Sequence, residues 1–186
     1  MSKIKLNAAS GGGSVAFEGP GTSGNDKIVK LPPTPGVIVQ VVQTIKTDVF
    51  TSNTNDSWVE ITGLNVNITP SSSSSKVLVS ANFGGSNGSS RLHLFRLLRD
   101  STAIGVSTFA TTNASAIYDS ESYGSDRNRA IGHIKIDFLD SPSSTSQITY
   151  RVQFYKNGSG NFHVNRRALN TGSGAISTIT AYEVAG

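Results

Sequence analysis

Strict alternation of apolar and polar residues late in the chain is the feature that most constrains its fold. Ile134, Ile136 and Phe138 alternate with polar residues, and residues 147–154 repeat the pattern. A period of two is that of a strand with one buried face. Shorter segments of this kind recur at spacings of about 8–12 residues with Gly, Ser and Asn between them, as in a sandwich. The sequence predicts an all-β protein, a jelly-roll-like sandwich of about nine strands.

Residues 1–36 differ from the rest of the chain in their pattern of apolar and glycine-rich pieces. Short apolar pieces alternate with glycine-rich pieces, and the segment closes with Pro32-Pro33-Thr34-Pro35-Gly36. These pieces hold too little apolar surface for a core of their own, so the segment must lie on something else. The proline cluster is a stiff, non-helical boundary. We predict an extended N-terminal β arm at residues 1–36, which anchors the chain or exchanges strands between subunits, and a jelly-roll domain at residues 37–186.

Two local patterns give sharper expectations. The segment 37–42 reads Val-Ile-Val-Gln-Val-Val, so it predicts a strand buried on both faces, packed on its partner sheet and on a subunit or the arm. Because this strand and the arm both need partners, we expect a homotrimer. Asn157-Gly158 is a strong signal for a tight hairpin, whose central residues need positive φ angles.

Composition excludes several classes of function. The chain has no cysteine, so it has no disulfide framework and no thiolate metal site. Its net charge of +4 comes from 16 basic and 12 acidic residues spread along the sequence, whereas nucleic-acid-binding proteins concentrate basic charge on one surface. No apolar run approaches the roughly 20 residues of a membrane span, and the first residues lack an apolar signal core. We therefore expect no nucleic-acid partner and no membrane insertion.

Catalytic and metal-binding patterns are also missing from the sequence. His93, His133 and His163 fall on different predicted strands, without a carboxylate at metal-ligand spacing. No Gly-x-Ser-x-Gly elbow is present, and the acidic residues of the 119–126 segment are indistinguishable from those of a solvated loop. We predict no catalytic residue, no metal and no cofactor, and hence a protein that is not an enzyme.

The segment Thr111–Arg129 is the best candidate for recognition. It is the longest segment without strand alternation inside the predicted sandwich, and long loops on rigid scaffolds are where recognition is concentrated. Tyrosine and arginine offer large contact surfaces, while the small residues around them adapt. The candidate residues for binding a host surface or a neighbouring subunit, two alternatives that the sequence leaves open, are Tyr118, Tyr123, Arg127 and Arg129.

Several segments resemble a group of small bacteriophage virion proteins of the tail-fibre-like and head-decoration type. The similar segments are Thr62–Pro70, Ser73–Val79, Leu97–Asp100, which predicts a hairpin, and Ser177–Val184. The resemblance covers most of the chain. It implies a trimeric jelly roll of the tumour-necrosis-factor-like kind, made in the cytoplasm of a host bacterium and assembled on a virion. It carries over no functional residue.

Three functional alternatives remain open on this basis. The first is a tail fibre or fibre tip that contacts a glycan or protein of the host surface. The second is a capsid decoration protein that stabilises the head. Both use the arm to join other virion proteins, and the short arm, with no extended shaft, keeps the second close to the first. The third is a lectin or carbohydrate-active domain on the same fold.

Overall fold

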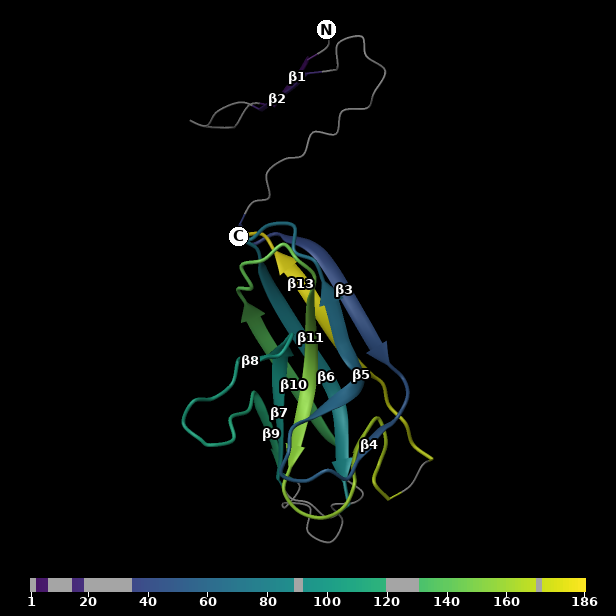
Figure 1. Cartoon of the computed structure of the whole chain (residues 1–186). Helices are drawn as coiled ribbons and strands as arrows, with labels where there is room; N and C mark the ends of the chain where they lie inside the picture. Colours follow the sequence, from purple (N-terminus) through teal and green to yellow (C-terminus); the bar gives the residue numbers. More distant parts are fainter. Residues whose placement is uncertain (1–2, 7–14, 19–34, 89–91, 120–130, 170–171) are drawn as a thin grey trace. The chain divides into compact units, whose positions relative to one another are not determined.

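The computed structural model describes residues 3–6, 15–18, 35–88, 92–119, 131–169 and 172–186. The chain divides into two compact units, Met1–Pro33 and Thr34–Gly186, which we describe one at a time. In the first unit, β1 (Lys3–Leu6) pairs antiparallel with β2 (Val15–Glu18). The second unit is a sandwich of two sheets (Figure 1). No helix long and apolar enough to cross a membrane occurs in the described ranges.

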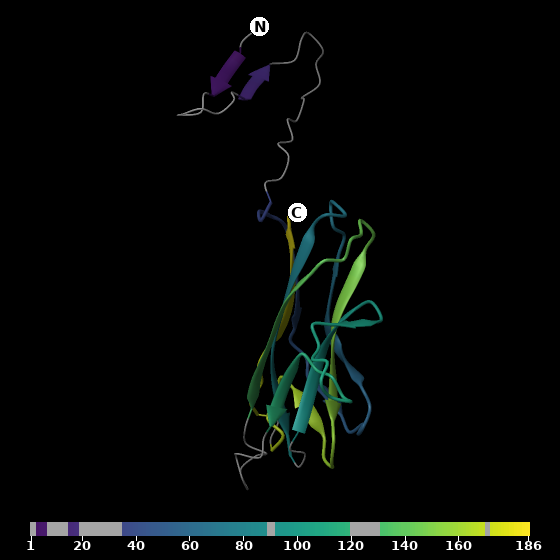
Figure 2. The ribbon, with the colours of Figure 1, turned by 90° about the vertical axis from the view of Figure 1, so that its left-hand side faces the viewer.

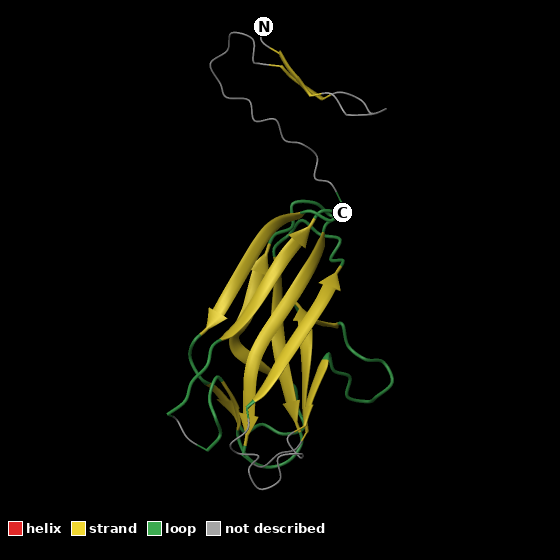
Figure 3. Ribbon diagram, turned by 180° about the vertical axis from the view of Figure 1, so that it is seen from behind, coloured by secondary structure: helices red, strands yellow, loops and turns green. Residues whose placement is uncertain are grey.

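The first sheet of the sandwich, sheet 1, has six strands. Its central strand β6 (Lys76–Asn87) pairs on one side with β10 (Gly132–Asp140), and on the other with β13 (Ser177–Val184) and then β12 (Phe162–Val164). The outer positions next to β13 and β12 are taken by β3 (Ile38–Lys46) and β4 (Phe50–Ser52). Figure 3 views the molecule from the side of this sheet.

The second sheet, sheet 2, has five strands. The order is β5 (Val59–Ile68), β11 (Ile148–Lys156), β7 (Leu92–Arg99) and β8 (Thr102–Ile104), and β9 (Ala116–Asp119) pairs with β7 on the same side as β8. A two-residue turn joins β7 to β8, so the hairpin predicted at Leu97–Asp100 is confirmed. All pairings in both sheets are antiparallel.

The chain passes from one sheet to the other at six of the ten connections between the described strands of the sandwich. It runs through β3 and β4 in sheet 1, β5 in sheet 2, β6 in sheet 1, β7 to β9 in sheet 2, β10 in sheet 1, β11 in sheet 2, and ends in sheet 1. This crossing order is that of a jelly roll, and the two layers are seen in Figure 2. The predicted fold class is confirmed, with eleven described strands in the sandwich where the sequence predicted about nine.

The core lies between the sheets and contains a cluster of aromatic rings. Phe162 stacks on Phe154, with ring centroids 4.8 Å apart, and its centroid lies 5.7 Å from that of Phe95. Ile136 and Val152, from the two cleanest alternating segments, are 4% and 0% exposed. The faces predicted from alternation are thus the buried ones. Gly85 makes room for the cluster, since a Cβ atom there would lie 2.8 Å from the Phe162 ring.

A buried polar contact joins the sheets at one end. Asp140, the last residue of β10, accepts a hydrogen bond from the Tyr150 hydroxyl at 2.7 Å and two from Arg99 Nη1 at 3.0 and 3.1 Å. Burial raises the pKa of Tyr150, and the hydrogen bond to Asp140 raises it further, so the phenol stays a donor at any physiological pH. Both carboxylate oxygens of this buried group are therefore satisfied, as buried charges require.

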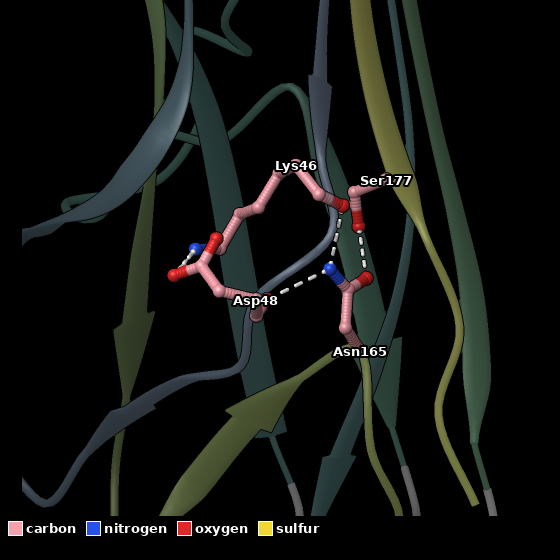
Figure 4. A network of polar contacts seen from close by, with 4 residues as sticks. All are labelled: Lys46, Asp48, Asn165 and Ser177. Atoms are coloured by element: carbon pink, nitrogen blue, oxygen red, sulfur yellow. Dashed lines mark hydrogen bonds and ion pairs between the residues drawn. The ribbon is translucent and has the colours of Figure 1, made fainter.

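A second polar network holds the other end of sheet 1 (Figure 4). Asn165 follows β12 with a positive φ of 68° and is 1% exposed. Its amide nitrogen donates to the carbonyl oxygens of Lys46 and Asp48, and its Oδ1 accepts from the Ser177 hydroxyl. One side chain thereby ties the end of β3, the turn toward β4 and the start of β13.

The hairpin predicted at Asn157-Gly158 is wrong. The turn exists, with Gly158 at φ 104°, but β11 before it belongs to sheet 2 and β12 after it belongs to sheet 1. The connection is held by Lys156, whose buried ammonium donates to the Gly158 carbonyl oxygen and to Asn55. The local sequence favoured a return of the chain to sheet 2. Tertiary contacts instead direct it to sheet 1.

Candidate interaction surfaces

The strand β3 at the edge of sheet 1 points most of its apolar side chains away from the core, and Val42 is the exception that packs against it. Directly paired residues in antiparallel strands share a face, and Gln40, Thr44 and Lys46 pair with inward residues of β13. The residues that pair with the outward positions of β13 include Ile38, Val41 and Ile45, which are 54–56% exposed. The predicted burial of 37–42 on both faces is therefore wrong for the single chain, which leaves the outward face uncovered.

The outward apolar side chains continue across sheet 1 as a belt. Register places Val41, Tyr182, Leu78 and Leu139 side by side on four neighbouring strands. Leu139 is 48% exposed, and Tyr182 and Leu78 are partly exposed. Ile38 pairs with Val184 in the adjacent row. The apolar belt, as we call it, consists of Ile38, Val41, Leu78, Leu139, Tyr182 and Val184.

The belt reaches β3, which has no second neighbouring strand among the described residues. Gly36 N donates to Ala185 O and Ala185 N to Val37 O, both at 2.8 Å, so the chain enters β3 beside the end of β13. From residue 37 to residue 45 the sequence has no charged residue and no proline. Natural edge strands are usually protected by such residues against pairing with other chains. This edge lacks that protection.

Besides the belt, the outward face of sheet 1 carries Ile45, Lys76 and a row of polar residues that contains an ion pair. In the row next to the belt, Ser80 donates to Asp137 Oδ1 at 2.7 Å. Lys135 forms an ion pair with Asp137, with 2.7 Å between Nζ and Oδ2. This pairing, foremost as a hydrogen bond, raises the pKa of Lys135 and lowers that of Asp137, so both stay charged and neutralise one another. This ion pair therefore adds no net charge to the face.

A pocket opens on the outer face of sheet 2, next to a long excursion of the chain. Between β8 and β9, residues 105–115 leave the sheet, and both flanking strands pair with β7. The pocket has a volume of about 660 Å³. Its walls come from β7, β9, the 105–115 loop and the turn after β11. The lining residues include Leu92, Leu94, Phe109, Ile117, Tyr155 and Asn157.

Aromatic and polar side chains extend from the pocket along sheet 2. Tyr155 lies between the pocket and Trp58, with 5.6 Å between the two ring centroids. The Arg96 guanidinium lies 4.2 Å from the centroid of the Trp58 ring, and its Nε donates to Gln153 at 2.8 Å. Burial lowers the pKa of Arg96. The side chains beside the pocket are thus fixed by mutual contacts.

The structure places only one of the four predicted recognition residues among those it describes. Tyr118 lies on β9, inside the segment predicted as a loop, and is opposite His93 in register. It is partly buried, its ring stacks on His93 with 5.8 Å between centroids, and Gly132 leaves room beside it. Tyr118 therefore packs toward the sandwich interior. Tyr123, Arg127 and Arg129 lie outside the described residues.

The three histidines lie on three different strands, β7, β10 and β12. His93 is buried beside Phe162, His133 is exposed on β10, and His163 is buried with its Nδ1 2.9 Å from the Thr51 hydroxyl. Within the described ranges no group of three or more His, Asp or Glu side chains is arranged to hold a metal ion.

Comparisons with known proteins give no family. No family model matches, and no curated protein matches. The solved structures to which the chain is similar include a mutant VP2 protein of infectious bursal disease virus in derived T=1 particles, with 16% identity and a TM-score of 0.41 over 97% of this chain and 44% of that one. Another is the virus-derived T=1 particle, with 12% identity and a TM-score of 0.42 over 90% and 41%. The chain spans less than half the length of these proteins.

Sequence reasoning missed the pocket and the belt. Phe109 is a single aromatic residue in a run of Ser, Thr and Ala between two strands, and it is 90% exposed. A large apolar residue isolated among small polar ones is a signal that could have indicated a surface site. The belt depends on the register between strands distant in sequence, which a single sequence does not show.

Proposed function

We propose that this chain is a non-enzymatic structural protein of a bacteriophage virion that assembles as a homotrimer. The observation that carries the proposal is the outward apolar side of β3 and the belt that continues it across sheet 1. Exposed apolar surfaces of this kind mark protein interfaces. A second copy of the chain is the partner that fits, because the ion pair on this face adds no net charge and the face presents a long, unprotected edge strand.

In this proposal the N-terminal arm joins the jelly roll to other virion proteins or to neighbouring subunits. The arm forms a unit separate from the sandwich. It contains apolar pieces without a core, and its junction at Gly36 borders the belt. Burying these pieces requires a surface on another chain or on the particle.

Between the two virion roles, we propose the tail fibre or fibre tip first. The pocket lies on sheet 2 and the belt lies on sheet 1. A trimer that covers the belts keeps the opposite layer accessible for a host surface. The capsid decoration protein is the alternative, and a lectin or carbohydrate-active domain is the third. Copy number separates the two virion roles, since a decoration protein is present in hundreds of copies per particle and a fibre in far fewer.

Sedimentation equilibrium with one variant pair tests the assembly. We expect the wild-type chain to sediment at three times its mass of 19.5 kDa at micromolar concentration. Val41 is 56% exposed, so covering it contributes about 1 kcal/mol, half the value for a fully buried aliphatic side chain. Val41→Asp also places in the interface a carboxylate whose desolvation costs several kcal/mol. This variant should be a folded monomer.

The matched control is Thr62→Asp, an exposed position on β5 in sheet 2. It introduces the same charge on the opposite layer and should remain a trimer. A monomeric wild-type protein, or a Val41→Asp variant that stays trimeric, contradicts the proposal.

A further inference from the structure

The pocket on sheet 2 is built from a fixed frame and not from a flexible loop. Ser107 N donates to Ala114 O at 3.1 Å and closes the base of the 105–115 loop. The Asn113 side-chain oxygen accepts from the Ser107 hydroxyl and from Ala110 N, each at 3.2 Å. Ser115 anchors the loop to β7 through its N–H, which donates to Phe95 O at 2.7 Å. These bonds hold residues 109–112 at the pocket without contribution from a ligand.

The loop presents an aromatic ring to solvent at the pocket wall. Phe109 is 90% exposed, so its position contributes nothing to the core. Opposite the loop, the pocket is lined by Tyr155, whose hydroxyl donates to Asp56 at 3.1 Å and whose ring contacts Trp58. The Phe109 ring is carried by an ordered loop, and the Tyr155 ring is fixed at both ends. The two rings are therefore preorganised apolar surfaces.

The rest of the lining combines apolar floor with small neutral polar groups. Leu92, Leu94 and Ile117 come from paired strands, and Ile117 is 65% exposed. Hydroxyl and amide groups at the rim come from Thr111, Thr112, Asn157 and Ser159. Among the described residues that line the pocket none carries a charge. A carboxylate or phosphate bound there would lose water and gain no ionic partner from these lining residues, which is costly.

We propose that this pocket binds a neutral glycan. A pyranose ring has apolar C–H faces that stack on aromatic rings, and hydroxyls at its edge that need donors and acceptors of both kinds. Phe109 and Tyr155 provide the aromatic rings for stacking. The neutral rim provides the hydrogen-bonding partners, because amide and hydroxyl groups both donate and accept. The volume of about 660 Å³ lies within the usual range for small-molecule sites. The inference rests on the proposed fibre role, whose host-facing surface it specifies.

Binding to a printed array of neutral and acidic glycans tests this inference with the full-length chain. We expect binding to neutral glycans and none that depends on an acidic sugar. The affinity of the best neutral glycan is then titrated in solution through the fluorescence of Trp58, the only tryptophan of the chain, which contacts Tyr155. Phe109→Ala should weaken this affinity at least tenfold with an unchanged melting temperature.

The matched control is Ile176→Ala, which also removes an exposed apolar side chain, 61% exposed and outside the pocket. It should leave the affinity unchanged. No neutral binding on the array, binding of acidic glycans only, or equal affinity of Phe109→Ala and the wild type overturns the inference. A wild-type trimer that binds no glycan leaves the assembly proposal standing, whereas a glycan-binding monomer refutes assembly and supports the pocket.

Discussion

Replacing Asn165 removes the side chain that ties three segments at one end of sheet 1 (Figure 4). Asn165→Gly deletes two hydrogen bonds from its amide nitrogen, 2.9 Å to Lys46 O and 3.0 Å to Asp48 O, and one of 2.5 Å from the Ser177 hydroxyl. The backbone hydrogen bonds of residue 165, to Gly84 O and from Ala175 N, remain. Glycine also tolerates the native φ of 68°.

The expected loss follows from these contacts. Each net hydrogen bond contributes about 1 kcal/mol, and a buried partner left unsatisfied adds up to ~1–3 kcal/mol. Because the Asp48 region is solvent-accessible, we expect a total of about 3 kcal/mol for Asn165→Gly. Asn165→Ala should cost roughly 1 kcal/mol more, since alanine disfavours the left-handed conformation. Ser177→Ala removes only one of the three bonds and should cost about 1 kcal/mol.

Urea unfolding at one fixed protein concentration measures these differences, and the concentration must be constant because assembly contributes to apparent stability. Adding Ser177→Ala to Asn165→Gly should lower the free energy of unfolding by no more than a few tenths of a kcal/mol. The hydrogen bond between these two side chains is already lost in Asn165→Gly. An Asn165→Gly variant within about 0.5 kcal/mol of wild type refutes the reasoning. So does an alanine variant more stable than the glycine variant.

Four further outcomes are expected. Val152→Asp buries an unpaired carboxylate at a fully buried position and should abolish cooperative thermal unfolding; a soluble variant with unchanged melting contradicts this. Burial, and then Arg166, lower the pKa of His163 below its ordinary 6.5, so its stabilising contribution is complete above pH 6.5 and is lost as the pH falls. In His163→Gln the melting temperature should therefore change less with pH between pH 7.5 and about 5 than in the wild type. Tyr118→Ala should cost about 2 kcal/mol in urea unfolding through lost packing on His93, although glycan binding stays intact. Deleting Met1–Pro35 should leave the jelly roll melting as before and abolish incorporation into particles, scored by immunoblot of purified virions.

The parts of the fold that were predictable are those where burial acts on one face of a strand. In residues 134–138 of β10 and 148–154 of β11 the apolar residues point to the core and the polar ones away from it, so alternation identifies both the strand and its faces there. In β3 the same alternation cannot reveal which face is inward. Gln40 is tolerated inside because, with its amide nitrogen facing Glu183, it donates to Glu183 Oε2 at 3.3 Å and Thr69 O at 3.2 Å.

The candidate sites were not predictable in the same way. Tyr118 was expected in a loop because residues 111–129 show no strand alternation, yet four residues suffice for β9 once β7 supplies a partner. The pocket depends on a loop ordered partly by hydrogen bonds between residues distant along the chain, such as that from Ser115 N to Phe95 O. Pairing partners and loop closure are tertiary effects, which override local composition.

The interruption between β8 and β9 makes the pocket wall replaceable without disturbing the sandwich. An unbroken strand would place Val106 opposite Phe95, but Ala116 lies there, so the chain gains ten residues. An even number keeps the same side chains inward when pairing resumes. Evolution could therefore replace this segment by another with an even number of inserted residues and alter what the pocket binds. An odd number would turn Tyr118 to solvent and Ile117 into the core.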